Sequence, residues 1–410
     1  MFESVARLLL PDDESGAGVV KSDERWRLDS TVPTDAAAVV WGREPTTCGG
    51  GAVRLAWNAA RRERALASLR CRPPRPLRVG SVYRWEPTVF YRSRLSGLRS
   101  AAAAGVLVEL GRGATHERLL DSAARAAGAR APVTSFRPGT DGSLLAPIAA
   151  ADGRRLILRA GEAGTPADPH RGAAALERLA PLWLATVPRP EGRGRVGHAA
   201  WTAETHLGGK RPWTVGPQLA MQAANLCLSL PPATGSPTAF EHDLEAIAAR
   251  LPGLRDRLSC VRETINPRMS ALPAAMRHGD LWAGNLLVDR GVLRGVVDWD
   301  SWHPAAVPGA DLLHLLGMQE AVRRGRSLGE LWLEAPWEGR AFRELTAGYW
   351  AVLGLRPDRE IREAVGWAWW ANQMACSLTR LPQLASDGNW LRRNVDLVVA
   401  TLEGEAPCGS

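Results

Sequence analysis

Three polar residues stand at a fixed spacing in HGDLWAGNLLVDRGVLRGVVDWD, the stretch from His278 to Asp300. Asn285 follows Asp280 after four intervening residues, and Asp298 ends the second of two apolar runs. The runs are typical of a hairpin that turns near Arg290-Gly291, which would bring these side chains together. Phosphoryl transfer needs such a set, because a carboxylate deprotonates the attacking hydroxyl while oxygen ligands hold Mg²⁺ beside the phosphates. The spacing therefore predicts Asp280 as the base and Asn285 and Asp298 as metal ligands.

The same stretch resembles the signature of the aminoglycoside phosphotransferase and choline kinase superfamily, H-G-D-x4-N followed by [IV]-D-W. Downstream, Gly309, Asp311 and Leu312 match the glycine and the Asp-Leu pair that open the next helix in that superfamily. The resemblance extends over roughly residues 115–400. It implies that His278 supports the catalytic loop by hydrogen bonding, and that Asp311 caps its helix and steadies the same loop.

The resemblance implies an α+β, two-lobed protein-kinase-like fold, and the remaining sequence is consistent with it. From Pro132 the pattern favours short antiparallel strands with a tight turn at Asp152-Gly153, and after Gly208 it becomes mainly helical. We expect an N-terminal accessory α/β domain over 1–114, an N-lobe with nucleotide-binding sheet and hinge over 115–207, and a helical C-lobe with catalytic loop and acceptor site over 208–405.

The resemblance places ATP in the N-lobe. The turn FRPGTDGS would bring backbone N–H groups of Gly139, Gly142 and Ser143 close to the phosphates, although by itself it is equally typical of an ordinary hairpin. The segment AETHLGGK resembles the hinge strand of the superfamily, so Glu204 and His206 are expected beside adenine.

Arg159 stands where the relatives place a lysine against the α- and β-phosphates. Arginine keeps the charge but has a different geometry. The helix that should fix this cation with a glutamate has Gly172 near the expected place and Glu177 further on. The usual salt bridge therefore lacks its partner at that position.

Three residues are candidates for the acceptor site: Asp300, Trp302 and Trp369. On a continuing strand Asp300 would face the same side as Asp298 and reach metal or a substrate amine, although a loop role is favoured. Trp369 falls outside an apolar stripe at helical spacing and would stack on a sugar ring or an apolar substrate. The stripe, which is expected to be core, consists of Trp367, Trp370, Met374, Leu378 and Leu381.

Composition limits the class of protein. The net charge of +8 and a pI near 9.7 suit anionic partners, but no interleaved aromatic and basic motif of a nucleic-acid binder is present. The six cysteines form no C-x-x-C pair, which fits a reducing cytoplasm. Neither a secretory signal nor an apolar run of roughly 18 residues is present, so we expect a cytoplasmic protein without membrane insertion. The oligomeric state stays open.

The sequence favours an ATP- and Mg²⁺-dependent O-phosphotransferase that acts on a hydroxyl of a small molecule. One alternative is a catalytically weak or inactive kinase-like protein that binds nucleotide in a regulatory role, which Arg159 and the missing glutamate would suit. A protein kinase is disfavoured because Trp299-Asp300 replaces the Phe-Gly pair that would follow the metal-binding aspartate. The basic charge of the chain also suits a neutral or anionic acceptor, such as a sugar, a glycan precursor or a secondary metabolite, better than a polycationic antibiotic.

Overall fold

The computed structural model describes residues 119–401, apart from 132, 134–135 and 139–142, and the backbone of five short strands closer to the N-terminus. These strands are β1 (Gly18–Val20), β2 (Ala38–Gly42), β3 (Ala52–Ala56), β4 (Val82–Arg84) and β5 (Leu107–Glu109). β1, β2 and β3 form a parallel sheet, and β4 pairs with β5 in antiparallel fashion. The remainder of the accessory domain expected over 1–114 lies outside the described residues.

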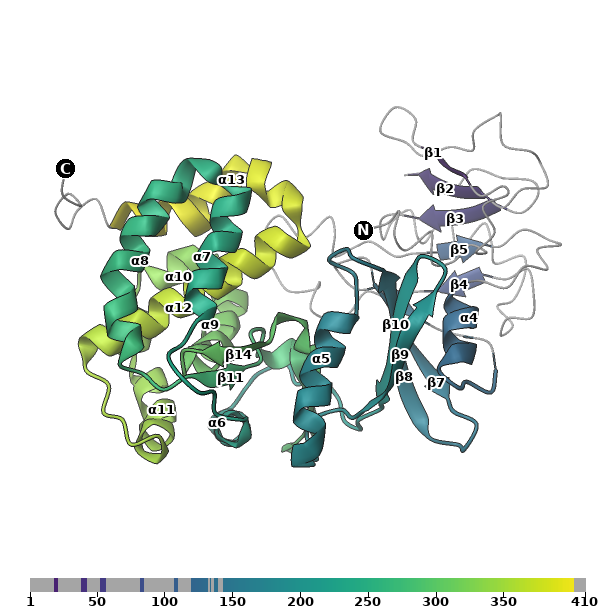
Figure 1. The fold of residues 1–410 in the computed structure, drawn as a ribbon, viewed down its shortest axis with the longest axis horizontal. Coiled ribbons are helices and arrows are strands. Elements are labelled where there is room, and N and C mark those ends of the chain that lie inside the picture. Colours follow the sequence, from purple (N-terminus) through teal and green to yellow (C-terminus); the bar gives the residue numbers. More distant parts are fainter. Residues whose placement is uncertain are drawn as a thin grey trace. The chain divides into compact units, whose positions relative to one another are not determined.

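An antiparallel sheet, as predicted, is the centre of the first compact unit, which spans Met1–His170 and Pro190–His206 (Figure 1). Its strands are β6 (Arg137–Pro138), β7 (Leu144–Ala149), β8 (Arg155–Glu162), β9 (Pro190–Val196) and β10 (Ala199–Thr205), in the order β6-β7-β8-β10-β9. Helix α4 (Leu119–Ala126) shares a buried core with Leu156 and Leu158 of β8. Because successive residues of a strand face opposite sides, Arg159 lies on the other face of the sheet.

The second compact unit, Arg171–Arg189 with Leu207–Ser410, is mainly helical, as predicted for the larger lobe (Figure 1). Its helices are α5 (His170–Leu179), α6 (Pro217–Ser229), α7 (Ala239–Arg250), α8 (Arg255–Ser270), α9 (Ala310–Arg324), α10 (Leu328–Trp332), α11 (Arg340–Val352), α12 (Arg359–Arg380), α13 (Gly388–Leu391) and α14 (Leu397–Val399). β11 (Ala275–Arg277) pairs with β14 (His303–Ala306), and β12 (Leu286–Asp289) pairs with β13 (Val292–Val296), both antiparallel. Across the described part of the chain, no helix combines the length and apolar character needed to cross a membrane.

Helix α12 runs through the core of this unit. The predicted apolar stripe is confirmed for Trp367, Trp370, Met374 and Leu378, each at most 2% exposed. Trp367 meets the ring of Trp332 from α10 edge to face, with centroids 4.5 Å apart. Burying such large side chains stabilises the fold by roughly 1.5 to 3 kcal/mol each, so α12 is a rigid support for whatever it contacts.

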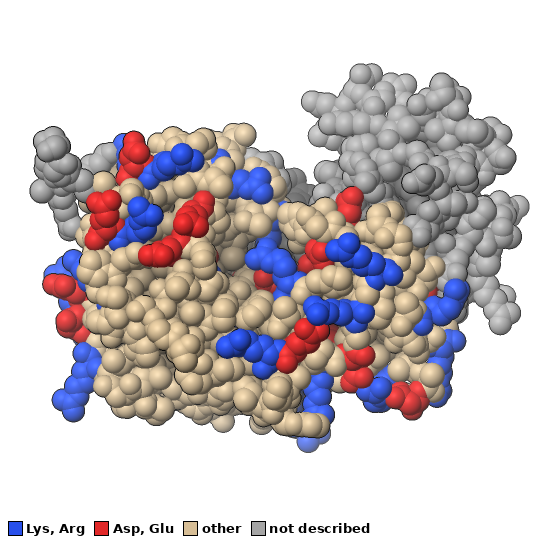
Figure 2. Space-filling model, in the orientation of Figure 1, with Lys and Arg blue, Asp and Glu red and all other residues tan. Residues whose placement is uncertain are grey.

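Charged side chains of both signs are interspersed on the face of the helical unit in view in Figure 2. Several arginines of this unit are paired with glutamates, for example Arg324 with Glu334 at 2.6 Å and Arg393 with Glu330 at 2.7 Å. Exposed pairs of this kind contribute little stability, typically below about 1 kcal/mol each. They do, however, reduce the free positive charge of an arginine-rich chain.

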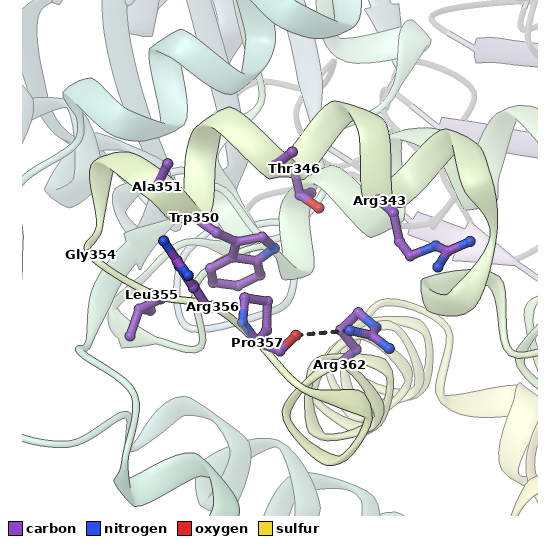
Figure 3. A pocket seen from close by; sticks show the side chains of 10 residues that line it. Arg343, Thr346, Trp350, Ala351, Gly354, Leu355, Arg356, Pro357 and Arg362 are labelled. Atoms are coloured by element: carbon purple, nitrogen blue, oxygen red, sulfur yellow. Dashed lines mark hydrogen bonds between the residues drawn. The ribbon is translucent and has the colours of Figure 1, made fainter.

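A cavity of about 580 Å³ lies beside the C-terminal half of α11, towards the start of α12 (Figure 3). Arg362 closes one side, since its guanidinium donates to the Pro357 carbonyl at 2.8 Å and pairs with Glu338 at 2.8 Å. The buried indole of Trp350 lines the cavity and packs on Gly309, where a Cβ would come within 2.7 Å of the ring. Because Gly309 directly precedes α9, this contact supports the start of that helix.

A buried ion pair and two histidines lie around β11 and β14. Arg277 of β11 contacts Asp243 of α7 at 2.7 and 2.9 Å. His303 of β14 has its Nε2 3.0 Å from Nδ1 of His242, and its Nδ1 accepts from the Ala305 N–H at 3.1 Å. Burial, together with the charge of Arg277 and the proximity of His242, lowers the pKa of His303 to about 4.

The lowered pKa of His303 predicts sensitivity to acid. The unfolded chain takes up this proton near the ordinary pKa of 6.5, whereas the folded chain resists it until about 4. The free energy of unfolding should therefore decrease as the pH falls from about 6.5 to about 4. In His303→Asn, whose side-chain oxygen can still accept from Ala305, the decrease should be shallower. Urea unfolding at several pH values measures both slopes, and equal slopes would contradict this assignment.

Candidate active site

The hairpin of β12 and β13 brings the two predicted metal ligands to one end. The Val297 N–H donates to the Asn285 carbonyl at 3.0 Å, so Asn285 lies across the hairpin from the residue before Asp298. At the other end Arg290 and Gly291 both have positive φ, 51° and 79°, as in the tight two-residue turns that join antiparallel strands. The predicted hairpin and its turn are thus confirmed.

Asp298 does not end a strand. β13 ends at Val296, and Asp298 adopts a left-handed backbone with φ 70° and ψ 62°. Residues 299–301 then form a 3₁₀ turn. Asp300 therefore lies in a turn, which is the role favoured for it, and not on a continuing strand on the same side as Asp298, because the chain changes direction at Asp298. A non-glycine residue in this conformation is strained, and such strain is concentrated at functional sites.

Asp300 and Trp302 contact the first turn of α5. Trp302 Nε1 donates to the Arg171 carbonyl at 2.9 Å. A Cβ at position 172 would collide with Oδ1 of Asp300, so the helix approaches this closely only because Gly172 has no side chain. The lack of a glutamate at Gly172 thus has a structural cause. Glu177 lies further along α5 in an exposed position.

Asp280 uses both of its carboxylate oxygens. Oδ1 lies 3.2 Å from His314 Nε2, and Oδ2 accepts from Arg380 at 3.0 Å. The Asn285 side-chain amide donates to the Asp280 backbone carbonyl at 2.8 Å, which links the predicted base to a predicted metal ligand. Burial and the charge of Asp298 oppose ionisation, but Arg380 and His314 outweigh them and lower the pKa of Asp280. Asp280 is therefore an ionised carboxylate at neutral pH.

Asp311 holds the backbone of the catalytic loop. Its two carboxylate oxygens accept from the N–H groups of His278 at 2.7 Å and Gly279 at 2.8 Å. This agrees with the expectation that Asp311 steadies the loop. The expectation that it also caps its helix is wrong, because Gly309 is the N-cap residue of α9 and Asp311 lies within the first turn.

His278 is part of the loop's internal support. Its Nε2 lies 3.1 Å from the Val297 carbonyl, its Nδ1 accepts from the Asp280 N–H at 3.2 Å, and its ring meets Trp299 edge to face at 4.6 Å. Burial lowers the pKa of His278 and is only partly offset by the acids around it. A neutral, buried histidine with both ring nitrogens engaged supports the backbone, as the resemblance implied.

Several polar residues around the loop carry no motif that would have marked them in the sequence. The Gly279 carbonyl accepts from Asn372 at 2.5 Å and from Gln373 at 2.9 Å, and Arg380 also donates to Ser301 Oγ at 2.7 Å. All three donors belong to α12, about a hundred residues from the loop, so only the tertiary fold brings them there. The position of His314 could have been predicted from the sequence. It follows Asp311 by three residues, so both side chains lie on the same face of α9.

Arg211 is a cation beside the metal-ligand end of the hairpin. Burial lowers the pKa of Arg211, and the charge of nearby Asp298 partly counteracts this. Its neighbour Lys210 is exposed and pairs its backbone with Val288 at 2.8 Å in both directions. Arg211 is therefore, like Arg380, a cation whose charge interacts with Asp298 within this unit.

The residues expected to bind nucleotide belong to the first compact unit. Arg159 lies in β8, opposite Thr202 of β10, and Glu204 is the penultimate residue of β10. The His206 N–H donates to the Arg155 carbonyl at 3.0 Å and extends the strand pairing. Ser143 is fully buried, and the approach of its backbone N–H to a phosphate stays a prediction. Gly139 and Gly142 lie outside the described residues.

Trp369 does not line an acceptor pocket. Its side chain is 1% exposed, so the indole has no face open to a substrate. Instead Nε1 donates to His314 Nδ1 at 3.1 Å, and the ring packs against Gly317 of α9. Trp369 lies outside the predicted apolar stripe, but it is still buried, and its indole N–H makes a hydrogen bond within the core.

Comparison with known proteins gives one family. A model of the phosphotransferase enzyme family matches residues 148–353, about half of the chain. An aminoglycoside phosphotransferase from Streptomyces rimosus ATCC10970, solved in complex with ADP and streptomycin, is 18% identical with a TM-score of 0.39, over 59% of this chain and 92% of that one. A macrolide 2'-phosphotransferase from Brachybacterium faecium is 19% identical with a TM-score of 0.41, over 71% and 99%. No curated protein gives a significant sequence match.

Replacing Asp311 should loosen the catalytic loop. Asp311→Ala leaves two buried backbone N–H groups without their charged acceptor, so the free energy of unfolding should fall by about 2 to 5 kcal/mol. Asp358→Ala is the matched control, because Asp358 is an exposed carboxylate that caps α12 through the Ile361 N–H at 2.8 Å. Its loss should cost about 1 kcal/mol. Equal losses in urea unfolding would mean that Asp311 acts as an ordinary surface contact.

Proposed function

Because the chain belongs to the phosphotransferase enzyme family and is a phosphotransferase with an alcohol group as acceptor, we propose that ATP bound with Mg²⁺ supplies the phosphoryl group. The acceptor is a hydroxyl of a small molecule. The observation that carries the proposal is the convergence of Asp280, Asn285 and Asp298 at one end of a single hairpin. Each offers the oxygen chemistry that phosphoryl transfer needs.

Asn285 and Asp298 would hold Mg²⁺. The nitrogen of the Asn285 side-chain amide is directed to Asp280, which leaves the amide oxygen to act as a ligand. Mg²⁺ prefers oxygen ligands and is commonly held by one or two protein groups together with substrate phosphates. When bound, the ion neutralises negative charge on the phosphates during transfer.

Asp280 would act as the general base. Its lowered pKa keeps it ionised at neutral pH, and its contact with Asn285 sets it beside the metal position. The acceptor hydroxyl would donate to this carboxylate, which orients the oxygen for attack and takes its proton. A positioned base of this kind typically contributes about 10² to 10⁴-fold in rate.

Arg159 is proposed to bind the α- and β-phosphates, with Glu204 and His206 beside the adenine. An arginine can hold phosphate oxygens through two parallel N–H donors, which a lysine cannot do. Arg211, near Asp298, is a second candidate for a phosphate contact.

A neutral or anionic acceptor is proposed, such as a sugar, a glycan precursor or a secondary metabolite. Arg380 already pairs with Asp280 at 3.0 Å, so the acid nearest to the reacting hydroxyl is not free to attract a polycation. The alternative of a weak or inactive nucleotide-binding protein is not favoured, because the residues proposed as base and metal ligands are all present and Asn285 contacts Asp280.

Two substitutions separate the base from the metal site. Asp280→Asn should keep the fold and Mg·ATP binding but lower turnover by at least about 10²-fold. Asp298→Ala removes a metal ligand, so Mg²⁺-dependent binding of ATP should itself weaken. Calorimetry with Mg·ATP, alongside an assay of ADP release, distinguishes them. Wild-type turnover in the first variant would remove Asp280 from the mechanism, and wild-type Mg·ATP affinity in the second would remove Asp298 from the metal site.

Arg159 can be tested by paired substitutions. Arg159→Ala should raise the KM for ATP or lower kcat, because a charge-assisted hydrogen bond to phosphate contributes roughly 1.5 to 3 kcal/mol. Arg159→Lys restores the residue usual in the relatives but gives up the two parallel donors, so activity should also fall. Steady-state kinetics measures both. If Arg159→Ala behaves as wild type, the phosphate cation lies elsewhere, with Arg211 as the next candidate.

A further inference from the structure

We propose that His314, held in a single tautomer by Trp369, is a positioning residue that fixes the carboxylate of Asp280 and leaves its Oδ1 open to the acceptor hydroxyl. The inference rests on the proposed function of Asp280 as general base. Neither His314 nor Trp369 belongs to the signature from which that function was predicted. His314 belongs to α9 and Trp369 to α12, and the packing of these two helices places both side chains at the site.

The tautomer follows from the hydrogen bonds of His314. The indole N–H of Trp369 can only donate, and it lies 3.1 Å from Nδ1 of His314. Nδ1 must therefore accept, so the single proton of a neutral imidazole resides on Nε2. Nε2 lies 3.2 Å from Oδ1 of Asp280, so this proton is directed at the carboxylate.

The Trp369 donor is itself held in place. Trp369 is 1% exposed and His314 is 2% exposed, so neither side chain has room for another rotamer. The indole occupies the space left by Gly317, where a Cβ would come within 2.7 Å of the ring. Gly317 follows His314 by three residues on α9, so one face of that helix provides both the imidazole and the space for its partner.

The two oxygens of Asp280 are consequently used unequally. Among the contacts of the described residues, Oδ2 receives Arg380 at 3.0 Å and Asn285 at 3.3 Å, whereas Oδ1 receives His314 alone. A carboxylate oxygen accepts in about two directions, so Oδ1 keeps one for the acceptor hydroxyl. With a donor on each oxygen, the carboxylate is also prevented from rotating.

The transfer step moves one proton to Asp280 and one phosphoryl group to the acceptor. The acceptor O–H bond breaks and its proton passes to Oδ1 of Asp280, while the acceptor oxygen forms a bond to the γ-phosphorus. The bond between that phosphorus and the bridging oxygen breaks, and ADP leaves with the electron pair. His314 keeps its own proton throughout, so its role is to orient Asp280 rather than to accept a proton.

The proposal is tested by removing the Trp369 donor while keeping an aromatic ring in the core. Trp369→Phe should lower kcat by about 10-fold or more with little change in the KM for ATP. Without a donor at Nδ1, the proton of His314 can reside on Nδ1 instead of Nε2, and Oδ1 of Asp280 then loses the hydrogen bond that positions it. His314→Ala should lower kcat at least as much. In His314→Gln the side-chain amide can donate to Oδ1 without help from Trp369, so most of the activity should return.

A double variant and a matched control sharpen the test. In Trp369→Phe/His314→Gln the loss caused by Trp369→Phe should vanish, since the glutamine needs no donor on its far side. Trp370→Phe is the control: it removes an equally buried indole whose Nε1 donates to the Asn394 carbonyl at 2.8 Å, and should leave kcat unchanged.

The outcomes distinguish this inference from the proposed function. If Asp280→Asn is inactive while Trp369→Phe and His314→Ala keep wild-type kcat, the positioning role is overturned and the base stands. If Trp370→Phe loses as much kcat as Trp369→Phe, or His314→Gln is as impaired as His314→Ala, the residues serve the core alone and the positioning role is overturned. Wild-type turnover in Asp280→Asn overturns both.

Discussion

Two neighbouring backbone N–H groups, those of His278 and Gly279, donate to the single buried carboxylate of Asp311. The site depends on this contact, because it fixes the backbone immediately before Asp280. Gly279 has φ 83°, and a Cβ there would overlap the Ser301 carbonyl, so the loop passes closer to the turn after β13 than any side chain would allow. The catalytic loop, helix α9 and that turn are thereby held in one arrangement, and small displacements of a reacting group are costly in rate.

Charge balance is the second constraint. The acids Asp280, Asp298 and Asp300 all act on Arg380: burial opposes its charge, but the acids prevail and raise the pKa of Arg380 well above its ordinary range. Removing one member of such a buried set leaves the others uncompensated. Arg380 therefore keeps Asp280 ionised without any bound ion, and a cation placed by Asn285 and Asp298 would add to a site that is already organised.

Local spacing predicted the hairpin, its turn and the convergence of Asp280 with Asn285, because these depend on neighbours in the chain. It favoured a loop position for Asp300 but could not give the direction of that loop, which the left-handed backbone of Asp298 turns towards Gly172. Local spacing could not predict contacts between helices that are far apart in the chain. Trp369 was assigned to an acceptor pocket because a period of 3.6 residues gives the face of a helix but not the neighbour that covers that face.

Phosphorus-31 NMR on the purified protein tests the central claim most directly. The protein would be incubated with ATP and Mg²⁺ and a panel of sugars, amino alcohols and aminoglycosides, with Asp280→Asn as the control. We expect at least one neutral or anionic hydroxyl compound to give a new phosphomonoester signal, formed in equal amount with ADP and absent in the control. Formation of the same phosphomonoester by Asp280→Asn at the wild-type rate, or transfer to polycationic aminoglycosides alone, would contradict it.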